Sequence, residues 1–218
     1  MRVAVTPGVT TNENEEAAVF IQGAAKPRFF RPRWWIGLAL VANLACGCAT
    51  TASFTAADTA TVDRLLGLIK ERLDTAPDVA RTKWNTKAPI QDLPREKQII
   101  DGVAKAATGY GLDPQVAGTF FTGQIEASKV VQNALHAQWA AKRQPPFAKV
   151  ADLGKDIRPV LDQLTSAMMR ALADALPVLE QPGGRRLLVA QSKAILAKAP
   201  GGDAAVREAV APLMTLSR

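Results

Sequence analysis

Apolar residues recur at the three- and four-residue spacing of an α-helix from residue 58 to the end of the chain. No stretch alternates between apolar and polar residues for long enough to predict a strand. The pattern therefore predicts an all-α fold in which residues 53–218 form a single-domain helical bundle. The clearest apolar stripe consists of Val62, Leu65, Leu66, Ile69 and Leu73.

Proline and glycine mark where the predicted helices begin and end. Pro77 suits the first turn of a short second helix, and Gly111 is a plausible helix stop. The pair Asp113 and Pro114 is a capping pattern that opens a long helix to about Lys142. The remaining helices are expected at about residues 94–110 and 152–179, with two shorter ones after Pro182-Gly183-Gly184 and Pro200-Gly201-Gly202.

The first 52 residues are expected to be an N-terminal extension and a signal peptide. Residues 26–49 contain four basic residues, then a twelve-residue apolar core, then small residues, which is the order of a secretory signal. A membrane span needs about 20 apolar residues, so this core is short for one. We expect cleavage after Ala49 or Ala52 and an exported protein, periplasmic or secreted, without stable membrane insertion after cleavage. An uncleaved anchor, or a lipid attached to Cys46 or Cys48, remains an alternative.

Composition narrows the function classes. The net charge is +7, but no basic run is longer than two residues, and we expect no nucleic-acid partner. His136 is the only histidine, and both cysteines precede the predicted domain, so we expect no metal site. The sequence also contains no glycine-rich phosphate-binding motif.

Several polar residues fall on the inner faces of predicted helices. Arg72 follows Leu65 by seven residues and Ile69 by three. Lys83 follows Val79 by four. For any one of them, a long side chain at the edge of the stripe is an alternative explanation. The other polar residues on inner faces are Asp92, Arg95, Glu96, Ser128, Gln132 and Arg158.

Together these residues predict a binding site for an anion. They comprise four cations and two anions, so about two positive charges would lack a protein partner if the side chains converged. Because an unpaired buried charge is costly, a ligand with two carboxylates would supply the partners. The planar fork of arginine suits a carboxylate. The sequence therefore predicts a site for a small dianion, without an obvious nucleophile.

The order and spacing of these residues resemble the all-helical chorismate mutase family, in particular its exported (periplasmic) γ subclass. The resemblance covers roughly residues 60–165. It implies an isomerase that converts its small-molecule substrate chorismate to prephenate, on the route to phenylalanine and tyrosine, by an intramolecular rearrangement without metal or cofactor. The segments that carry it are ERL (71–73), KW (83–84), PIQDLPRE (89–96), QIEASKVVQ (124–132) and the DL and IR pairs within 152–158.

The resemblance implies that Arg72 and Arg158 bind the two substrate carboxylates and that Ser128 contacts one of them. Arg158 is followed by Pro159, which disfavours a helical conformation at Arg158. Arg158 is thus expected at the end of a turn rather than inside a helix. Lys155 is the alternative to Arg158 for the second carboxylate.

The resemblance also implies that Lys83 and Gln132 donate hydrogen bonds to the ether oxygen of the substrate. Glu96 and the backbone of Asp92 would contact the substrate hydroxyl, and Arg95 would position that side of the site. Some exported relatives have a glutamate at the position of Gln132 that must stay protonated, so we expect activity here to persist above neutral pH. The catalytic residues implied are Arg72, Lys83, Glu96 and Gln132.

Two other functions compete with the enzyme. An exported helical protein that binds a small dicarboxylate without catalysis would retain Arg72 and Arg158, but would not need Lys83 and Gln132 together. A basic module for acidic surface polymers would need an exposed basic stripe, whereas the cations after residue 140 are scattered. The oligomeric state stays open; the resemblance implies a homodimer with a whole site in each subunit.

Overall fold

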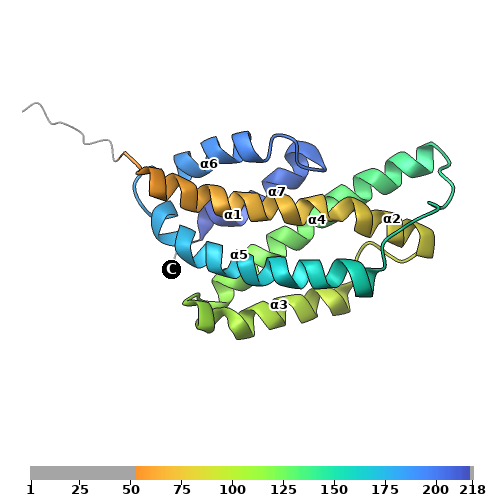
Figure 1. Cartoon of the computed structure of the whole chain (residues 1–218), viewed down its shortest axis with the longest axis horizontal. Coiled ribbons are helices and arrows are strands. Elements are labelled where there is room, and N and C mark those ends of the chain that lie inside the picture. The colour runs from red at the N-terminus through yellow and green to blue at the C-terminus, as the bar shows by residue number, and fades with distance from the viewer. Residues whose placement is uncertain (1–52, 217–218) are drawn as a thin grey trace, which may run out of the picture. The chain divides into compact units, whose positions relative to one another are not determined.

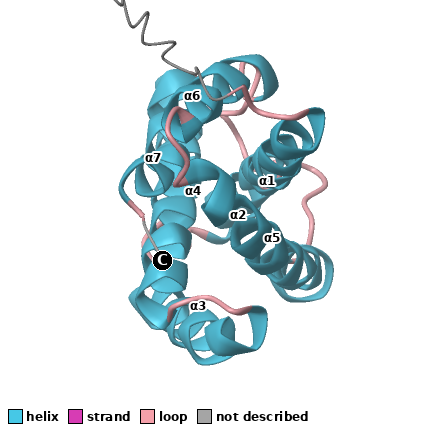
Figure 2. Cartoon of the chain, turned by 90° about the vertical axis from the view of Figure 1, so that its left-hand side faces the viewer, coloured by secondary structure: helices cyan, strands magenta, loops and turns pink. Residues whose placement is uncertain are grey.

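The computed structural model describes residues 53–216, and every regular element in this range is helical, which confirms the all-α prediction (Figure 1, Figure 2). A 3₁₀ turn, η1 (Thr108–Tyr110), continues the helix predicted to reach Tyr110, and a π-helical turn, η2 (Leu153–Ile157), precedes α5. The α-helices of this range are α1 (Ala56–Asp74), α2 (Ala76–Thr86), α3 (Leu93–Ala107), α4 (Pro114–Ala141), α5 (Arg158–Leu179), α6 (Gly184–Ile195) and α7 (Gly202–Thr215).

Helix α4 is the element around which the others are arranged. It packs against α7, α3, α2 and α1. Helix α1 lies alongside α5 and also packs against α6 (Figure 1). In the turned view, α7 lies on the side of α4 that faces away from α5 (Figure 2). Because α1, α2 and α3 all contact α4, side chains from several helices can converge beside it.

Side-chain caps and glycines fix where helices begin. Before α1, Thr55 Oγ1 accepts a hydrogen bond from the Asp58 N–H at 3.0 Å, and Asp58 Oδ2 accepts one from the Thr55 N–H at 2.9 Å. Asp113 Oδ1 accepts hydrogen bonds from two backbone N–H groups at 2.7 and 3.2 Å, which confirms the predicted cap of the long helix. Helices α6 and α7 instead follow Gly183 and Gly201, whose φ angles of 92° and 80° cost glycine no strain.

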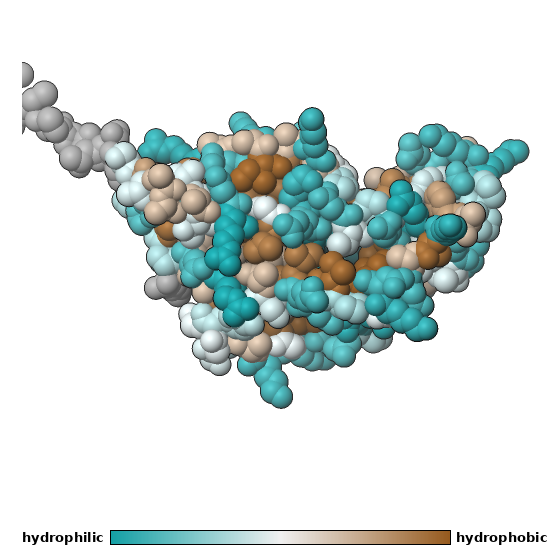
Figure 3. Space-filling model, viewed as in Figure 1, coloured by the Kyte–Doolittle hydropathy of each residue, from teal (hydrophilic) through white to brown (hydrophobic). Residues whose placement is uncertain are grey.

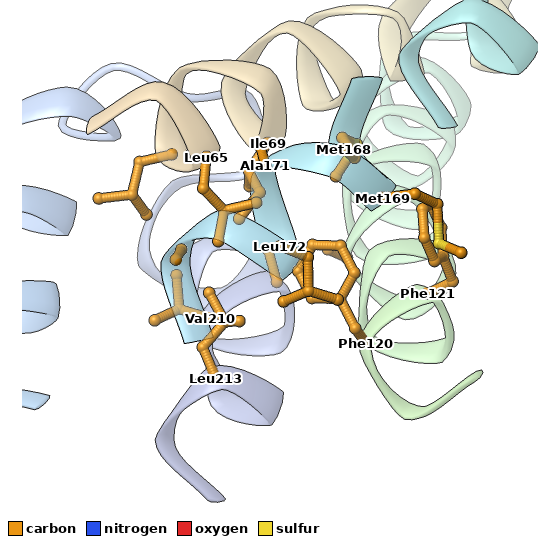
Figure 4. Packing of buried hydrophobic residues seen from close by; sticks show 14 of the residues in the cluster. Leu65, Ile69, Phe120, Phe121, Met168, Met169, Ala171, Leu172, Val210 and Leu213 are labelled. Atoms are coloured by element: carbon orange, nitrogen blue, oxygen red, sulfur yellow. The ribbon is translucent and has the colours of Figure 1, made fainter. Parts of the chain in front are cut away.

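One apolar cluster joins α1, α4 and α5. All five residues of the predicted α1 stripe are buried. They belong to one cluster with Phe120 and Phe121 of α4 and with Met168, Met169 and Leu172 of α5 (Figure 4). Each such side chain contributes roughly 1.5–3 kcal/mol when fully buried. The cluster therefore holds these three helices where their polar residues can reach a common cavity.

The helix predicted from Asp152 to about Leu179 is interrupted near its start. Asp152 Oδ1 accepts hydrogen bonds from two backbone N–H groups of η2 at 2.7 and 2.8 Å, and α5 begins only at Arg158. Pro159 has no N–H to donate, so it suits the first turn of a new helix better than the interior of a continuous one. Arg158 has helical backbone angles (φ −58°, ψ −43°) and is the first residue of α5, so the expectation that Pro159 would keep it out of a helix was wrong.

Polar side chains cover most of the face shown in Figure 1, and apolar atoms reach the surface in a band across its middle (Figure 3). No helix within residues 53–216 combines the length and apolar character needed to cross a bilayer. The predicted extension and signal peptide lie outside the described residues, together with Cys46, Cys48 and both expected cleavage sites. The domain boundary at residue 53 stays a prediction.

Helix α7 crosses α4 closely because α4 has a glycine at the contact. A Cβ atom at Gly123 would lie 2.5 Å from Pro212 Cγ and 2.8 Å from the Glu208 carbonyl oxygen. Beside it, the buried side chain of Gln124 donates from Nε2 to the Ala209 carbonyl oxygen at 2.8 Å. Both cysteines of the chain precede residue 50, so no disulfide bond ties α7 to the rest of the bundle.

We expect Gly123→Ala to lower the free energy of unfolding by about 1–3 kcal/mol, because the added methyl group overlaps a backbone oxygen that only a helix shift can move. Urea denaturation followed by circular dichroism measures this. Gly67→Ala in α1 is the control: its new Cβ meets nothing within 4 Å, so it should be neutral or slightly stabilising. Equal stability of the two variants would contradict the close approach of α7.

Candidate active site

Side chains from α1 to α5 and from η2 enclose a cavity of about 430 Å³. Lys155, the alternative to Arg158, does not line it. By contrast, all eight residues that the sequence predicted for the site line this cavity. They are Arg72, Lys83, Asp92, Arg95, Glu96, Ser128, Gln132 and Arg158.

Arg72 is the one buried charged residue in the described part of the chain, with 6% of its surface exposed. It lies between Ile69 and Leu73 on the buried stripe of α1, so the helix cannot turn it toward solvent. Its Nε has no hydrogen-bond partner within residues 53–216. Burial, and to a lesser extent the charge of Arg95, lowers the pKa of Arg72 to about 10, while Asp162 acts in the opposite direction. The guanidinium is therefore charged at neutral pH.

Lys83 reaches the cavity from α2. Its Nζ donates to the carbonyl oxygen of Ile90, in the loop before α3, at 2.7 Å. Burial lowers the pKa of Lys83, and the charge of Lys129 acts in the same direction. The carboxylates of Asp92 and Glu96 oppose this lowering of the pKa. An ammonium group has three N–H donors, so the bond to Ile90 orients Lys83 and leaves two donors for a ligand.

The start of α3 presents charged groups that are held by other helices. The Asp92 side chain caps α3 by accepting from the Arg95 N–H at 3.1 Å. The Asp92 N–H donates to Glu96 Oε1 at 3.1 Å. The second oxygen of Glu96 accepts from Lys129 Nζ of α4 at 3.1 Å. Arg95 Nη2 lies 3.5 Å from Asp162 Oδ1 of α5. A carboxylate and a guanidinium are thus fixed at the cavity wall.

Ser128 and Gln132 lie one turn apart on α4. Gln132 is 4% exposed, and its Nε2 donates to Ser128 Oγ at 3.0 Å. Its Oε1 is buried without a hydrogen-bond partner in the described residues. Leaving such an atom unpaired costs about 1–3 kcal/mol. Nε2 carries a second N–H that is available to a ligand, and the Ser128 hydroxyl hydrogen is not used by Gln132.

The segment before α5 is tied to α2. Asn85 Nδ2 donates to the Phe147 carbonyl oxygen, and Asn85 Oδ1 accepts from the Phe147 N–H, both at 2.8 Å. Thr82 Oγ1 donates to the Ala151 carbonyl oxygen at 2.7 Å. These bonds place η2 against the cavity and Arg158, which is exposed, at its wall.

Two charged residues of the cavity, Lys129 and Asp162, are absent from the sequence prediction. Lys129 follows Ile125 by four residues, and Asp162 follows Arg158 by four, so helical spacing could have indicated both. With them, five cations and three carboxylates line the cavity among the residues described. The excess of two positive charges is the one expected from the sequence, although a larger set of side chains produces it.

The cavity can bind anions and direct N–H donors at them. Among the described residues, neither cysteine nor histidine lines it, and no cluster of histidine, cysteine and carboxylate side chains is arranged to hold a metal. His136 lies outside it, with Nε2 2.9 Å from the Ala80 carbonyl oxygen. The His136 ring centroid is 5.3 Å from that of Trp84 and 5.5 Å from that of Trp139. We interpret His136 as a structural residue.

Comparison with known proteins gives concordant matches. Residues 58–133 match the family described as chorismate mutase type II, and this segment contains every predicted site residue except Arg158. The chain is 32% identical over 145 residues to the secreted chorismate mutase of Mycolicibacterium smegmatis. The aligned region covers 66% of this chain and 80% of that protein.

Solved structures agree with the sequence matches. The crystal structure of chorismate mutase from Burkholderia phymatum is similar with a TM-score of 0.68 and 31% identity, covering 73% of this chain and 99% of that one. The chorismate mutase from Burkholderia thailandensis gives a TM-score of 0.65 and 36% identity, with coverages of 70% and 98%.

We expect Asn85→Ala to release the segment that precedes η2. Both hydrogen bonds to Phe147 are lost, so the Phe147 amide should exchange with deuterium at least about tenfold faster. The free energy of unfolding should fall by about 1–2 kcal/mol. Asn133→Ala, at an exposed position of α4, is the matched control and should change neither value. Unchanged protection of Phe147 in Asn85→Ala would contradict the tether.

Proposed function

Since the chain belongs to the chorismate mutase type II family, it is an isomerase that rearranges chorismate to prephenate, and we propose that the cavity around Arg72 and Gln132 is its active site. The observation that carries this proposal is the excess of two positive charges in that cavity. Chorismate has two carboxylates, so its charge matches the excess. The buried Nε of Arg72 lacks a hydrogen-bond partner in the described chain, so its N–H is available to a substrate carboxylate.

The substrate carboxylates bind, in this proposal, to Arg72 and Arg158, and Ser128 adds a hydroxyl donor. These residues belong to three different helices whose separation the apolar core fixes. Two anchors at a fixed distance select the compact conformer of the substrate in which the reacting carbon atoms are close together. The entropy cost of reaching that conformer is thereby met by binding rather than during the reaction.

Lys83 and Gln132 act at the ether oxygen. The reaction breaks a C–O bond while it forms a C–C bond in the same molecule, and negative charge grows on the ether oxygen. The free N–H groups of Lys83 and one N–H of the Gln132 amide donate to this oxygen. The other N–H of the amide donates to Ser128 Oγ, so the Ser128 hydroxyl hydrogen stays free for a substrate carboxylate. Donors aimed at growing charge stabilise the transition state more than the substrate, and this difference accelerates the reaction.

The first turn of α3 recognises the substrate hydroxyl. Glu96 accepts a hydrogen bond from this hydroxyl, and the Asp92 N–H contacts its oxygen. Arg95 is held against Asp162 and borders the same part of the cavity. This side of the site orients the ring and takes no part in bond breaking.

A dicarboxylate-binding protein without catalysis was the alternative function. It would need Arg72 and Arg158, but not two further donors directed at a third point. The family of the chain and the presence of Lys83 and Gln132 in the same cavity favour the enzyme.

The name of the secreted relative supports export of this chain, as does the predicted signal peptide. We propose that the protein is periplasmic or secreted, with lipid attachment at Cys46 or Cys48 as the alternative anchor. We also propose a homodimer, as the family resemblance implies. Each subunit would have a complete site, since residues of one chain line the cavity. Light scattering of the purified protein tests the dimer.

We expect the purified protein to consume chorismate without added metal or cofactor, followed by the loss of chorismate absorbance. Gln132→Ala should lower kcat by about 10²–10³-fold, which is typical when one donor to a developing negative charge is removed. Arg72→Ala should lower kcat/KM by at least about 10²-fold, because it removes a charged partner of the substrate. Arg64→Ala, on the exposed side of the same helix, is the control and should keep full activity. Wild-type turnover in either cavity variant would contradict the assignment.

We expect kcat/KM to decrease at alkaline pH. A base loses its charge as pH rises through its pKa, and the pKa values of Arg72 (about 10) and Lys83 are both lowered. Arg72 is therefore charged at neutral pH, and Lys83 loses its charge at a lower pH than an unperturbed lysine does. We expect activity to be flat between about pH 6 and 8 and to fall as pH approaches about 10.

Gln132→Glu is the matched variant for the pH dependence, because a glutamate at this position donates only while it is protonated. Its activity should already decline with rising pH between about pH 6 and 8. A decline of the wild-type protein in that range, or a flat profile for Gln132→Glu, would contradict the role of Gln132 as a neutral donor.

A further inference from the structure

Lys129 lines the cavity proposed as the active site, but the proposed mechanism gives it no contact with the substrate. It follows Ser128 on α4, and only 14% of its side chain is exposed. Its Nζ lies 2.7 Å from Glu126 Oε1 on the same helix and 3.1 Å from Glu96 Oε2 on α3. Lys129 therefore bridges a partly exposed carboxylate and the carboxylate that receives the substrate hydroxyl.

The Glu96 carboxylate is held through both of its oxygens. Oε1 accepts from the Asp92 N–H at 3.1 Å, and Oε2 accepts from Lys129 Nζ at 3.1 Å. One hydrogen bond would leave the carboxylate free to rotate, whereas two donors, one at the N-cap of α3 and one on α4, fix its plane. Each carboxylate oxygen has two acceptor sites, so these bonds leave capacity for a substrate hydroxyl.

Lys129 is suited to this task because it keeps its charge. Burial acts to lower the pKa of Lys129, but hydrogen bonds and attraction from Glu126 and Glu96 outweigh it and raise the pKa. Glu126 is 45% exposed and lies outside the cavity, so it anchors the ammonium without adding charge to the substrate site.

We infer that Lys129 is a positioning residue for the rearrangement, which holds the Glu96 carboxylate in the orientation that accepts the substrate hydroxyl. The inference rests on the proposed function of the cavity and on the proposed role of Glu96 in it. It differs from a general attraction of the dianion by a positive charge, because it makes every effect of Lys129 depend on Glu96.

Lys129→Met removes the ammonium and keeps an unbranched side chain. We expect KM for chorismate to rise about tenfold while kcat stays within about threefold, since the hydroxyl contact is made in both the bound substrate and the transition state. Lys129→Arg, which retains charged donors, should restore most of the loss. Glu96→Gln alone should also raise KM, and Lys129→Met should cause no further rise in that background.

Lys97→Met is the matched control for loss of one lysine charge near Glu96. Lys97 pairs with Asp101 at 2.7 Å, its side chain is 74% exposed, and it does not line the cavity. Its KM should equal that of the wild type. Circular dichroism and thermal melting check the fold of each variant, and Lys129→Gln is assayed by the same criteria if the methionine variant does not fold.

An unchanged KM in Lys129→Met would overturn the inference while leaving the active site intact. Equal KM increases in the presence and absence of the Glu96 carboxylate would also overturn it, because Lys129 would then act on the dianion directly. Unchanged kinetics in Glu96→Gln alone would instead place the error in the proposed role of Glu96, and the inference would fail with it.

Discussion

A guanidinium buried at the end of α1, without a carboxylate at ion-pairing distance in the described chain, is the constraint on which the rest of the site depends. Arg72 lies on the same stripe as the leucines and isoleucine of the core, so the packing that stabilises α1 also forces its charge inward. An unpaired buried charge destabilises a fold by several kcal/mol. Asp162 acts on Arg72 from a distance, and in the proposed function a doubly charged substrate supplies the missing partner. In this proposal, selectivity for a dianion follows from where α1 places Arg72.

The reaction needs no covalent partner, so the accuracy of side-chain positions matters more than any single functional group. Hydrogen bonds from neighbouring residues fix these positions in the structure. Ile90 orients the ammonium of Lys83, and Ser128 holds the amide of Gln132. Asn85 ties the segment that leads to Arg158 onto α2. In each case, a neighbouring polar group limits the freedom of a side chain or segment that lines the cavity.

The sequence predicted those features that depend on the spacing within one helix. The stripe of α1, the inward direction of Arg72 and the cap at Asp113 all follow from period and local chemistry. Spacing within a helix says nothing about which helix faces it, so the pairing of Arg95 with Asp162 across α3 and α5 could not be predicted. The choice between Arg158 and Lys155 likewise depended on the π turn η2, which no simple pattern in the sequence indicates.

The most direct test of the central claim is a crystal structure of the protein with prephenate bound. We expect one carboxylate on Arg72 and the other on Arg158, the product hydroxyl on Glu96, and the Gln132 amide still donating to Ser128 Oγ. Prephenate bound outside this cavity, or bound in it with neither carboxylate on Arg72, would contradict the claim that the inward charges form the active site.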